Sequence, residues 1–482
     1  SISGVDLNPF AVAIARFRLT VAAMRAAGID RLNDAPAFTY HLAVGDSLLY
    51  GHAGVQGSLL DEIDEREKAQ SQQENADESF AYANEDVAEH PSILDRGRYH
   101  VVVGNPPYIT VKDKALNEAY RQTYKTCHRQ YALSVPFMEL FFELVQKGDA
   151  TTAAGFVGQI TSNSFMKREF GAKVIESLLS GKDPGNPVDL TNVIDTSGAY
   201  IPGHGTPTVI LIGRRRRPTG KTLRAVLGVR GEPGQPKDPA KGLVWSQIIE
   251  HLDDPSFNGD YVTITDLDRS ALETHPWSMS GGGASDLKIA IDADRQTLGE
   301  RADSIGYTGQ TNADDVFLAP KGAFDIRRVE PAAHRQVVIG EVVRDFEVAT
   351  SDHGMFLYDA DSLLNISEFP GAYRWMWPAR TTTWERATFA KVSYRAEGRS
   401  WWEWHQVSLD RLKTPLSLVF AFVATHNHFV LDRGGKVFNR SAPVIKLPAD
   451  ATEDDYLDLL GVLNSSTACF WLKQVSYPKG GD

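Results

Sequence analysis

The first 217 residues alternate short apolar runs with helical stretches, which is typical of a parallel sheet covered by helices. Residues 4–7 predict a strand that ends in an acid, and Asn8-Pro9 then begins an Ala-rich helix that ends at Gly28. Further apolar runs predict five more strands, at residues 41–46, 99–103, 153–160, 191–195 and 207–212. The pattern therefore predicts an α/β fold, with residues 1–217 as its first domain.

The periodicity weakens after residue 217. Residues 218–240 are rich in Gly, Pro and Lys, and we interpret them as a linker or a hairpin excursion. Residues 241–482 contain many aromatic residues and short apolar runs at 337–340, 355–358 and 418–423. This part predicts a second domain of mixed α/β structure.

Composition narrows the class of protein. A chain of 482 residues with 42% apolar and 23% charged residues can form several buried cores. No stretch is long enough to cross a bilayer, and the start lacks a signal-peptide pattern. Cys127 and Cys469 are isolated from each other, which favours the reducing cytoplasm and argues against a metal site.

The net charge of −12 is a weak argument against nucleic-acid binding, because the charge is unevenly distributed. Many of the acidic residues lie in residues 61–90, which predict a solvated insert that is mobile or helical. The arginines at 214–217 and between 374 and 399 form local basic regions.

Asn105-Pro106-Pro107-Tyr108 directly follow the predicted strand at 99–103. Proline fixes its own φ and keeps the preceding residue extended, so the Asn105 amide and the Pro106 carbonyl project beyond the strand end. Two fixed acceptors can hold an amino group, and Tyr108 offers an aromatic face for a flat ring. The segment predicts a pocket for an adenine whose exocyclic amine is alkylated, although Asn and Pro also occur in ordinary turns.

Three predicted strands of this sheet end in polar residues. Asp6 ends the first strand, Asp46 ends the second, and Asn105 follows the third. Open α/β sheets bind ligands at the carboxyl ends of their strands, so we expect these residues to face one cleft. Asp6 is placed to bind the hydroxyls of a ribose, and Asp46, with Ser47 beside it, to accept from the amino group of an adenine cofactor.

These motifs resemble those of the adenine-specific DNA methyltransferases with an Asn-Pro-Pro-Tyr motif. Segments 4–13, 45–48, 158–165 and 200–208 are similar to those of the PglX methyltransferases of BREX and phage-growth-limitation defence systems. The resemblance is strong over residues 1–217 and thinner beyond them. It implies a Rossmann-like class I methyltransferase sheet, the cofactor S-adenosylmethionine, double-stranded DNA as partner, and contacts with other phage-defence proteins.

The same resemblance implies roles for individual residues. Asp6 and Leu7 would contact the cofactor ribose, Asp46 and Ser47 the cofactor adenine, and Asn105 both cofactor and target. Pro106, Pro107 and Tyr108 complete the catalytic segment. Phe165 and Lys167 would help to enclose the flipped base, with core packing an equal alternative for Phe165.

One departure from the family pattern concerns the cofactor site. A Gly-rich loop should follow a strand that precedes Asp6, but only Ser1, Ile2 and Ser3 precede Gly4. That strand would lie between the strands at 4–7 and 99–103, and without it two strand edges lack partners. We expect this chain to be a piece of a longer protein and to bind the cofactor weakly by itself.

Sequence-specific binding requires a second region, and residues 300–450 are the candidate recognition domain. Segment 307–312 is polar and contains a glycine, and arginines alternate with tryptophans at 374–380 and 399–404, which is common on nucleic-acid-binding surfaces. A Trp-rich core with stacked arginines is the alternative. The candidate DNA-contacting residues are Tyr307, Gln310, Asn312, Arg374, Arg380 and Arg399.

The sequence therefore favours an enzyme that flips adenine out of double-stranded DNA and methylates its exocyclic amine, as the modification component of a phage-defence system. Two alternatives stay open. One is a DNA-recognition module without catalysis of its own, and the other is part of a combined restriction–modification enzyme, although we find no convincing nuclease motif. A dehydrogenase fits least, because Asn105–Tyr108 would have no role in it.

Overall fold

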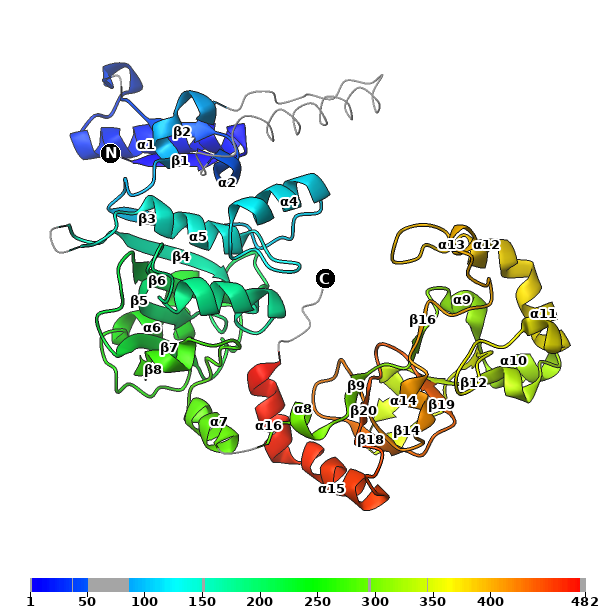
Figure 1. Cartoon of the computed structure of the whole chain (residues 1–482). Coiled ribbons are helices and arrows are strands. Elements are labelled where there is room, and N and C mark those ends of the chain that lie inside the picture. Colours follow the sequence, from blue (N-terminus) through cyan, green and yellow to red (C-terminus); the bar gives the residue numbers. More distant parts are fainter. Residues whose placement is uncertain are drawn as a thin grey trace, which may run out of the picture. The chain divides into compact units, whose positions relative to one another are not determined.

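The computed structural model describes residues 2–36, 38–50, 86–149, 152–293, 296–344 and 346–476. The chain divides into two compact units, residues 1–287 and residues 288–481, which we describe separately (Figure 1). The predicted acidic insert at 61–90 lies outside the described residues except for its last five positions. None of the described helices combines the length and the apolar character that a membrane crossing requires.

The first unit begins with a small β–α–β layer. Strand β1 (Ser3–Asp6) pairs in parallel with β2 (His41–Val44). Helix α1 (Pro9–Ala27) connects them; the Asn8 side chain accepts from the N–H of Phe10 at its start, and Gly28 ends it with φ of 68°. These ends are the predicted ones, because Asn caps a helix, Pro fits its first turn and Gly adopts the left-handed conformation freely.

The main sheet of the first unit has six strands in the order β3-β4-β6-β5-β7-β8. β3 pairs in parallel with β4, β4 and β6 are antiparallel, and so are β6 and β5. β7 is parallel to β5, and β8 is antiparallel to β7. The strand bounds are Val101–Gly104 for β3, Phe156–Ser162 for β4, Asp189–Asp195 for β5, Thr208–Arg214 for β6, Thr222–Gly228 for β7 and Val262–Asp268 for β8.

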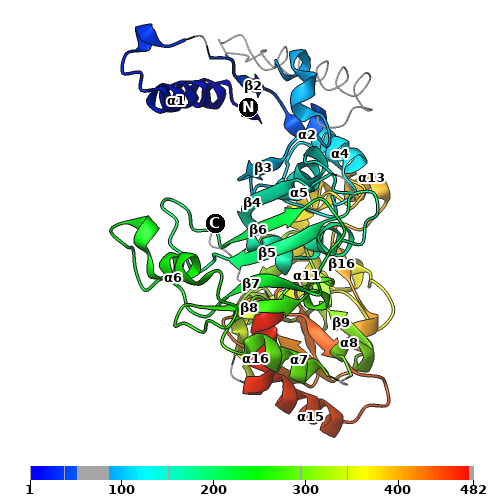
Figure 2. The same cartoon turned by 90° about the vertical axis from the view of Figure 1, so that its left-hand side faces the viewer.

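Helices cover both faces of this sheet (Figure 2). Val193 and Leu211 pack in the core that includes the residues of α5 (Ser134–Leu144). Their neighbours Ile194 and Ile212 lie in a second core with α6 (Leu243–His251). Alternate residues of one strand point to opposite faces, so the continuous apolar runs in the sequence reflect burial on both sides. Among the described residues the first unit also has the α-helices α2 (Ser47–Tyr50), α4 (Lys114–Thr123) and the start of α7 (Ala284–Asp292).

The structure differs from the sequence-based expectation in two respects. β1 and β3 are not hydrogen-bonded to each other, so within the described residues the three polar strand ends belong to two sheets rather than one. This is the position at which the sequence predicts a missing strand. The predicted linker at 218–240 also contains β7, whose residues Leu223 and 225–227 are buried, so the first unit extends to residue 287 rather than 217.

The second unit is a mixed α/β structure with two four-stranded sheets, in the orders β11-β15-β12-β19 and β18-β17-β20-β9. Short pairs β10–β16 and β13–β14 complete its strands. The bounds in the first sheet are Leu318–Ala319 for β11, His353–Met355 for β15, His334–Val338 for β12 and Lys436–Phe438 for β19. In the second they are Phe429–Asp432 for β18, Ser417–Phe420 for β17, Val444–Lys446 for β20 and Ser304–Gly306 for β9.

The remaining elements of the second unit are short, apart from its last two helices, α15 (Glu453–Leu463) and α16 (Ser466–Val475). The paired strands are β10 (Gly309–Gln310), β16 (Gln406–Val407), β13 (Val343–Arg344) and β14 (Glu347–Val348). The helices are α8 (Leu298–Arg301), α9 (Asp314–Phe317), α10 (Lys321–Ile326), α11 (Pro370–Met376), α12 (Arg380–Trp384), α13 (Tyr394–Glu397) and α14 (Asp410–Lys413).

Candidate active site

The ends of β1 and β2 bring the two predicted cofactor carboxylates together. The register aligns Asp6 with Val44, and the N–H of Gly45 donates to the carbonyl of Asp6 at 3.0 Å. Asp6 is exposed and accepts the N–H of Asn8 at 2.8 Å, and Leu7 beside it is 65% exposed. Asp46 and Ser47 follow directly after β2, so both carboxylates lie at one end of the parallel pair.

Asp46 is more constrained than Asp6. Its Oδ1 accepts the N–H groups of Leu48 at 2.8 Å and Leu49 at 3.2 Å, and its Oδ2 accepts the hydroxyl proton of Tyr120 from α4. Burial raises the pKa of the Asp46 carboxyl, while these hydrogen bonds oppose the shift. Burial and the nearby carboxylate hold the pKa of Tyr120 far above its usual value, so Tyr120 acts as a donor. The contact joins Asp46 to the segment that follows Asn105–Tyr108.

Asn105–Tyr108 directly follow β3, as the sequence predicts. Asn105 is exposed, Pro106 is buried, and Tyr108 is half-buried, which raises the pKa of its phenol. The Tyr108 hydroxyl donates to Asn105 Oδ1 at 2.7 Å. Within the described residues no hydrogen bond joins this segment to the carboxylate of Asp6 or of Asp46.

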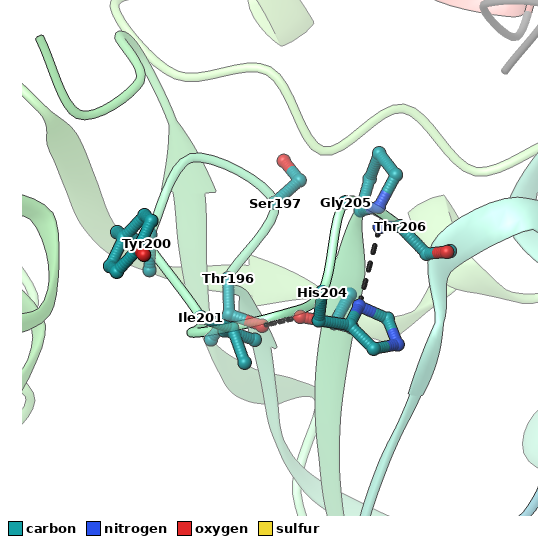
Figure 3. Close-up of a pocket in the computed structure, with 10 residues that line it drawn as sticks. Thr196, Ser197, Tyr200, Ile201, His204, Gly205 and Thr206 are labelled. Carbon is teal, nitrogen blue, oxygen red and sulfur yellow. Dashed lines mark hydrogen bonds between the residues drawn. The ribbon is translucent and has the colours of Figure 1, made fainter. Parts of the chain in front are cut away.

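The loop between β5 and β6 contacts Tyr108. The rings of Tyr108 and His204 meet edge-on, with centroids 5.4 Å apart and planes at 84°. The N–H of Thr206 donates to His204 Nδ1 at 3.2 Å (Figure 3). Ten residues between 196 and 208 line a cavity of about 130 Å³, and His204 and Thr206 are among them. The Asn105–Tyr108 segment and this cavity therefore lie at the same end of the six-stranded sheet, where β3 and β4 end.

Phe165 and Lys167 follow β4 at the same end of the sheet. Phe165 is only 1% exposed and packs edge-on against Trp277, with ring centroids 5.7 Å apart, which is a core position. Lys167 is half-buried, and burial lowers the pKa of its ammonium group while the charge of Asp195 opposes the shift. Asp195, at the end of β5, is itself buried, which raises the pKa of its carboxyl, and it accepts the N–H of Ser197 at 2.9 Å.

The predicted recognition segment 307–312 forms contacts within the second unit. The Tyr307 hydroxyl donates to Gln406 Oε1 at 2.6 Å, and the Gln310 amide donates to Asn312 Oδ1. Asn312 is exposed and has φ of 54°, a left-handed conformation that Asn tolerates better than most residues.

The three predicted DNA-contacting arginines differ in their surroundings. Arg374 is exposed, and Arg380 stacks over Trp377 with its guanidinium carbon 3.8 Å from the ring centroid. Arg399 instead donates to Glu403 at 2.6 Å and to the carbonyls of Trp404 and His405. Since Trp401 and Trp404 are buried, much of this aromatic segment is core.

Sequence reasoning did not assign Tyr120, Asp195 or His204 to the site. Tyr120 lies 74 positions after Asp46, and nothing local to α4 indicates that contact. His204 falls in segment 200–208, which carried the resemblance but received no role. The sequence offered one indication that His204 lies near Tyr108: segment 200–208 precedes a strand of the same predicted sheet.

Comparison with known proteins extends these observations. Residues 1–193 match the model of the family described as Eco57I restriction-modification methylase. The adenine-specific methyltransferase PglX of Streptomyces coelicolor (strain ATCC BAA-471 / A3(2) / M145) is 51% identical over 491 aligned residues, which cover 100% of this chain and 39% of PglX. The type II methyltransferase M.PaeR7I of Pseudomonas aeruginosa is 23% identical over 294 residues, 58% of this chain and 45% of that protein.

A solved structure supports the fold of the whole chain. The type IIL restriction-modification enzyme MmeI, in complex with DNA, aligns with 99% of this chain and 60% of its own, with a TM-score of 0.51 and 12% identity. The chain spans less than half the length of PglX and of M.PaeR7I. Along its full length it is similar to a PglX-type adenine-specific methyltransferase, and its first 193 residues match the Eco57I methylase family.

Proposed function

We propose that this chain is the catalytic and recognition part of an enzyme that methylates the exocyclic amine of adenine in double-stranded DNA, using S-adenosylmethionine. The observation that carries the proposal is the 51% identity to PglX over the whole chain. The position of Asn105–Tyr108 at the carboxyl end of β3 supports it, because ligands of open α/β sheets bind at such ends.

The proposed roles follow from the groups that project from the carboxyl end of β3. A target adenine in a duplex must be flipped out before its amine is accessible. Asn105 Oδ1 and the Pro106 carbonyl would accept its two N–H bonds and direct the nitrogen lone pair toward the methyl donor. The amide oxygen has two lone pairs, so Asn105 can accept from the base while it still accepts from Tyr108. Tyr108 would stack on the base, which replaces about 1–3 kcal/mol of lost stacking.

The residues at the ends of β1 and β2 fit the proposed cofactor. Asp6 is exposed and suits ribose hydroxyls, and Asp46 offers a carboxylate that already accepts from three donors of this chain. When bound, S-adenosylmethionine supplies the methyl group on a sulfonium leaving group. The chain's part is to hold both reactants in line, and the reaction requires no covalent enzyme intermediate.

Replacing Asn105 tests the proposal. Cells that produce the full-length protein should contain N6-methyladenine at one sequence motif, and Asn105→Ala should lower that methylation by about 100-fold or more, because positioned polar groups contribute this much to a rate. Asn258→Ala, at an exposed position of the same unit, is the matched control and should methylate normally. Near-normal methylation by Asn105→Ala would show that the pocket is elsewhere.

A DNA-recognition module without catalysis is the second candidate. The unpaired edges of β1 and β3 in the described residues favour it for this chain in isolation. Sequence-specific DNA binding by the full-length protein, with no methylated adenine in the cells, would support this candidate. Methylation that depends on Asn105 would exclude it. A role in phage defence is part of our proposal and is tested by phage plating on cells with and without the Asn105→Ala substitution.

A further inference from the structure

His204 contacts the one aromatic residue of the Asn105–Tyr108 segment. Tyr108 is held at two points, since its hydroxyl donates to Asn105 Oδ1 at 2.7 Å and its ring meets the ring of His204 edge-on at 5.4 Å. Edge-to-face pairs at this separation are attractive because of the ring quadrupoles. His204 therefore restrains the ring on which, in our proposed function, the target base stacks.

His204 is itself fixed by its own loop. The N–H of Thr206 donates to His204 Nδ1 at 3.2 Å, so in the neutral ring the proton is on Nε2 (Figure 3). The N–H of His204 donates to the carbonyl of Ile201 at 3.2 Å, and Gly203 between them has φ of 67°, which glycine adopts without strain. The turn and the ring hydrogen bond together set the direction of the imidazole.

The sheet topology explains how this loop reaches Tyr108. β3 and β4 are parallel, and β6 is antiparallel to β4 with Ser162 paired to Thr208. The carboxyl end of β3 and the start of β6 therefore lie at the same end of the strands. Only β4 separates these two strands in the sheet. The loop before Thr208 extends across the end of β4 to Tyr108.

We propose that His204 is a positioning residue for methyl transfer: it holds the Tyr108 ring so that the base stacks in one orientation and Asn105 keeps its alignment. This inference rests on the proposed function. His204 acts through Tyr108 and by the presence of a ring, so a ring without nitrogen atoms should replace it.

Three variants of the full-length protein test the inference, with DNA that carries the motif found by mapping methylated adenines. His204→Ala should lower kcat by about 3- to 10-fold, as expected for loss of an aromatic pair, with the KM for DNA changed by no more than about twofold. His204→Phe should restore kcat to within about twofold. His251→Ala, which removes a stacked histidine–phenylalanine contact on α6, is the matched control and should have normal kcat.

Two further measurements separate positioning from a general structural effect. In DNA with 2-aminopurine at the target position, His204→Ala should give brighter emission than the parent, because the flipped base stacks less regularly on Tyr108, and His204→Phe should match the parent. In the Tyr108→Ala background, His204→Ala should cause no further loss of kcat, since coupled residues are not additive.

Each outcome decides the question. If the parent protein methylates adenine but His204→Ala is as active as His251→Ala, the inference is wrong and the proposed function stands. The inference is also wrong if His204→Phe is as slow as His204→Ala, or if the two losses add in the double variant. If the parent protein does not methylate adenine at all, the proposed function itself fails.

Discussion

In the proposed function, Asn105 Oδ1 accepts from two donors, Tyr108 and the target amine. Its Oδ1 already accepts from the Tyr108 hydroxyl at 2.7 Å, yet the residue is exposed and one lone pair is left for an incoming amine. Pro106 beside it is buried, so the backbone at this point is fixed by packing as well as by the ring of proline. The segment therefore combines a rigid backbone with an accessible acceptor.

Gln159 of β4 is a buried polar residue next to the strand that precedes this segment. It is 2% exposed, it pairs in register with Gly104, and neither atom of its amide has a hydrogen-bond partner in the described residues. A buried polar group without a partner costs about 1–3 kcal/mol.

We expect Gln159→Met, which removes the amide at similar volume, to raise the midpoint of urea unfolding. The gain should correspond to about 1–3 kcal/mol, because the uncompensated desolvation is removed. Gln247→Met is the matched control and should destabilise the chain, since Gln247 Oε1 accepts the N–H of Tyr261 at 3.2 Å. Equal destabilisation by both variants would mean that the Gln159 amide has a partner, such as water.

At the scale of elements, α5 buries a carboxyl group against the sheet. Burial raises the pKa of Glu143 to about 7, and this effect exceeds that of Arg96, whose guanidinium lies 3.0 Å from Glu143 Oε2. The unfolded chain releases this proton near the ordinary glutamate pKa of 4.5, whereas the folded chain keeps it up to about pH 7. Between these values the folded state binds more protons, so this residue makes the protein less stable as the pH rises.

Unfolding of the chain from pH 5 to pH 8 tests this assignment. The Glu143→Gln variant should match the parent at the acidic end and become more stable than it toward pH 8, by roughly 1–3 kcal/mol, because Gln needs no ionisation. Glu89→Gln, at an exposed position of the same unit, is the control and should show no such divergence. A variant that is less stable than the parent at pH 8 would indicate that the ion pair with Arg96 stabilises the folded protein by more than burial of the Glu143 charge destabilises it.

The elements of the first unit were predictable from sequence where local rules dominate. The ends of α1 follow from Asn8, Pro9 and Gly28, and the strands before Asp46 and Asn105 follow from apolar runs that end in turn residues. The position of β7 was not predictable, because the Gly- and Pro-rich residues beside Thr222–Gly228 obscure a strand that only pairing with β5 and β8 reveals. Contacts between distant residues, such as Tyr120 with Asp46 and His204 with Tyr108, have no local signal at all.

For the whole molecule, the arrangement of sheets bears on cofactor binding. In the described residues β1 pairs only with β2, and β3 pairs only with β4, so each has one edge without a strand partner. Val101 and Val103 of β3 are 57% and 75% exposed, and Phe10 and Phe17 of α1 are 60% and 63% exposed. The β1–β2 pair that carries Asp6 and precedes Asp46 thus has one strand edge without a partner in the described residues.

We therefore expect the 482-residue chain by itself to bind S-adenosylmethionine with a Kd weaker than about 1 µM, which corresponds to less than about 8 kcal/mol of binding free energy. An open strand edge lets water and backbone motion compete with the ligand, and ordering that edge consumes part of the binding free energy. Isothermal titration of this chain, compared with a longer protein that contains it, measures the difference. A longer protein that binds at least tenfold more tightly would agree with this view. Binding by the 482-residue chain at or below about 1 µM would contradict it, because the two carboxylates would then suffice without a strand between β1 and β3.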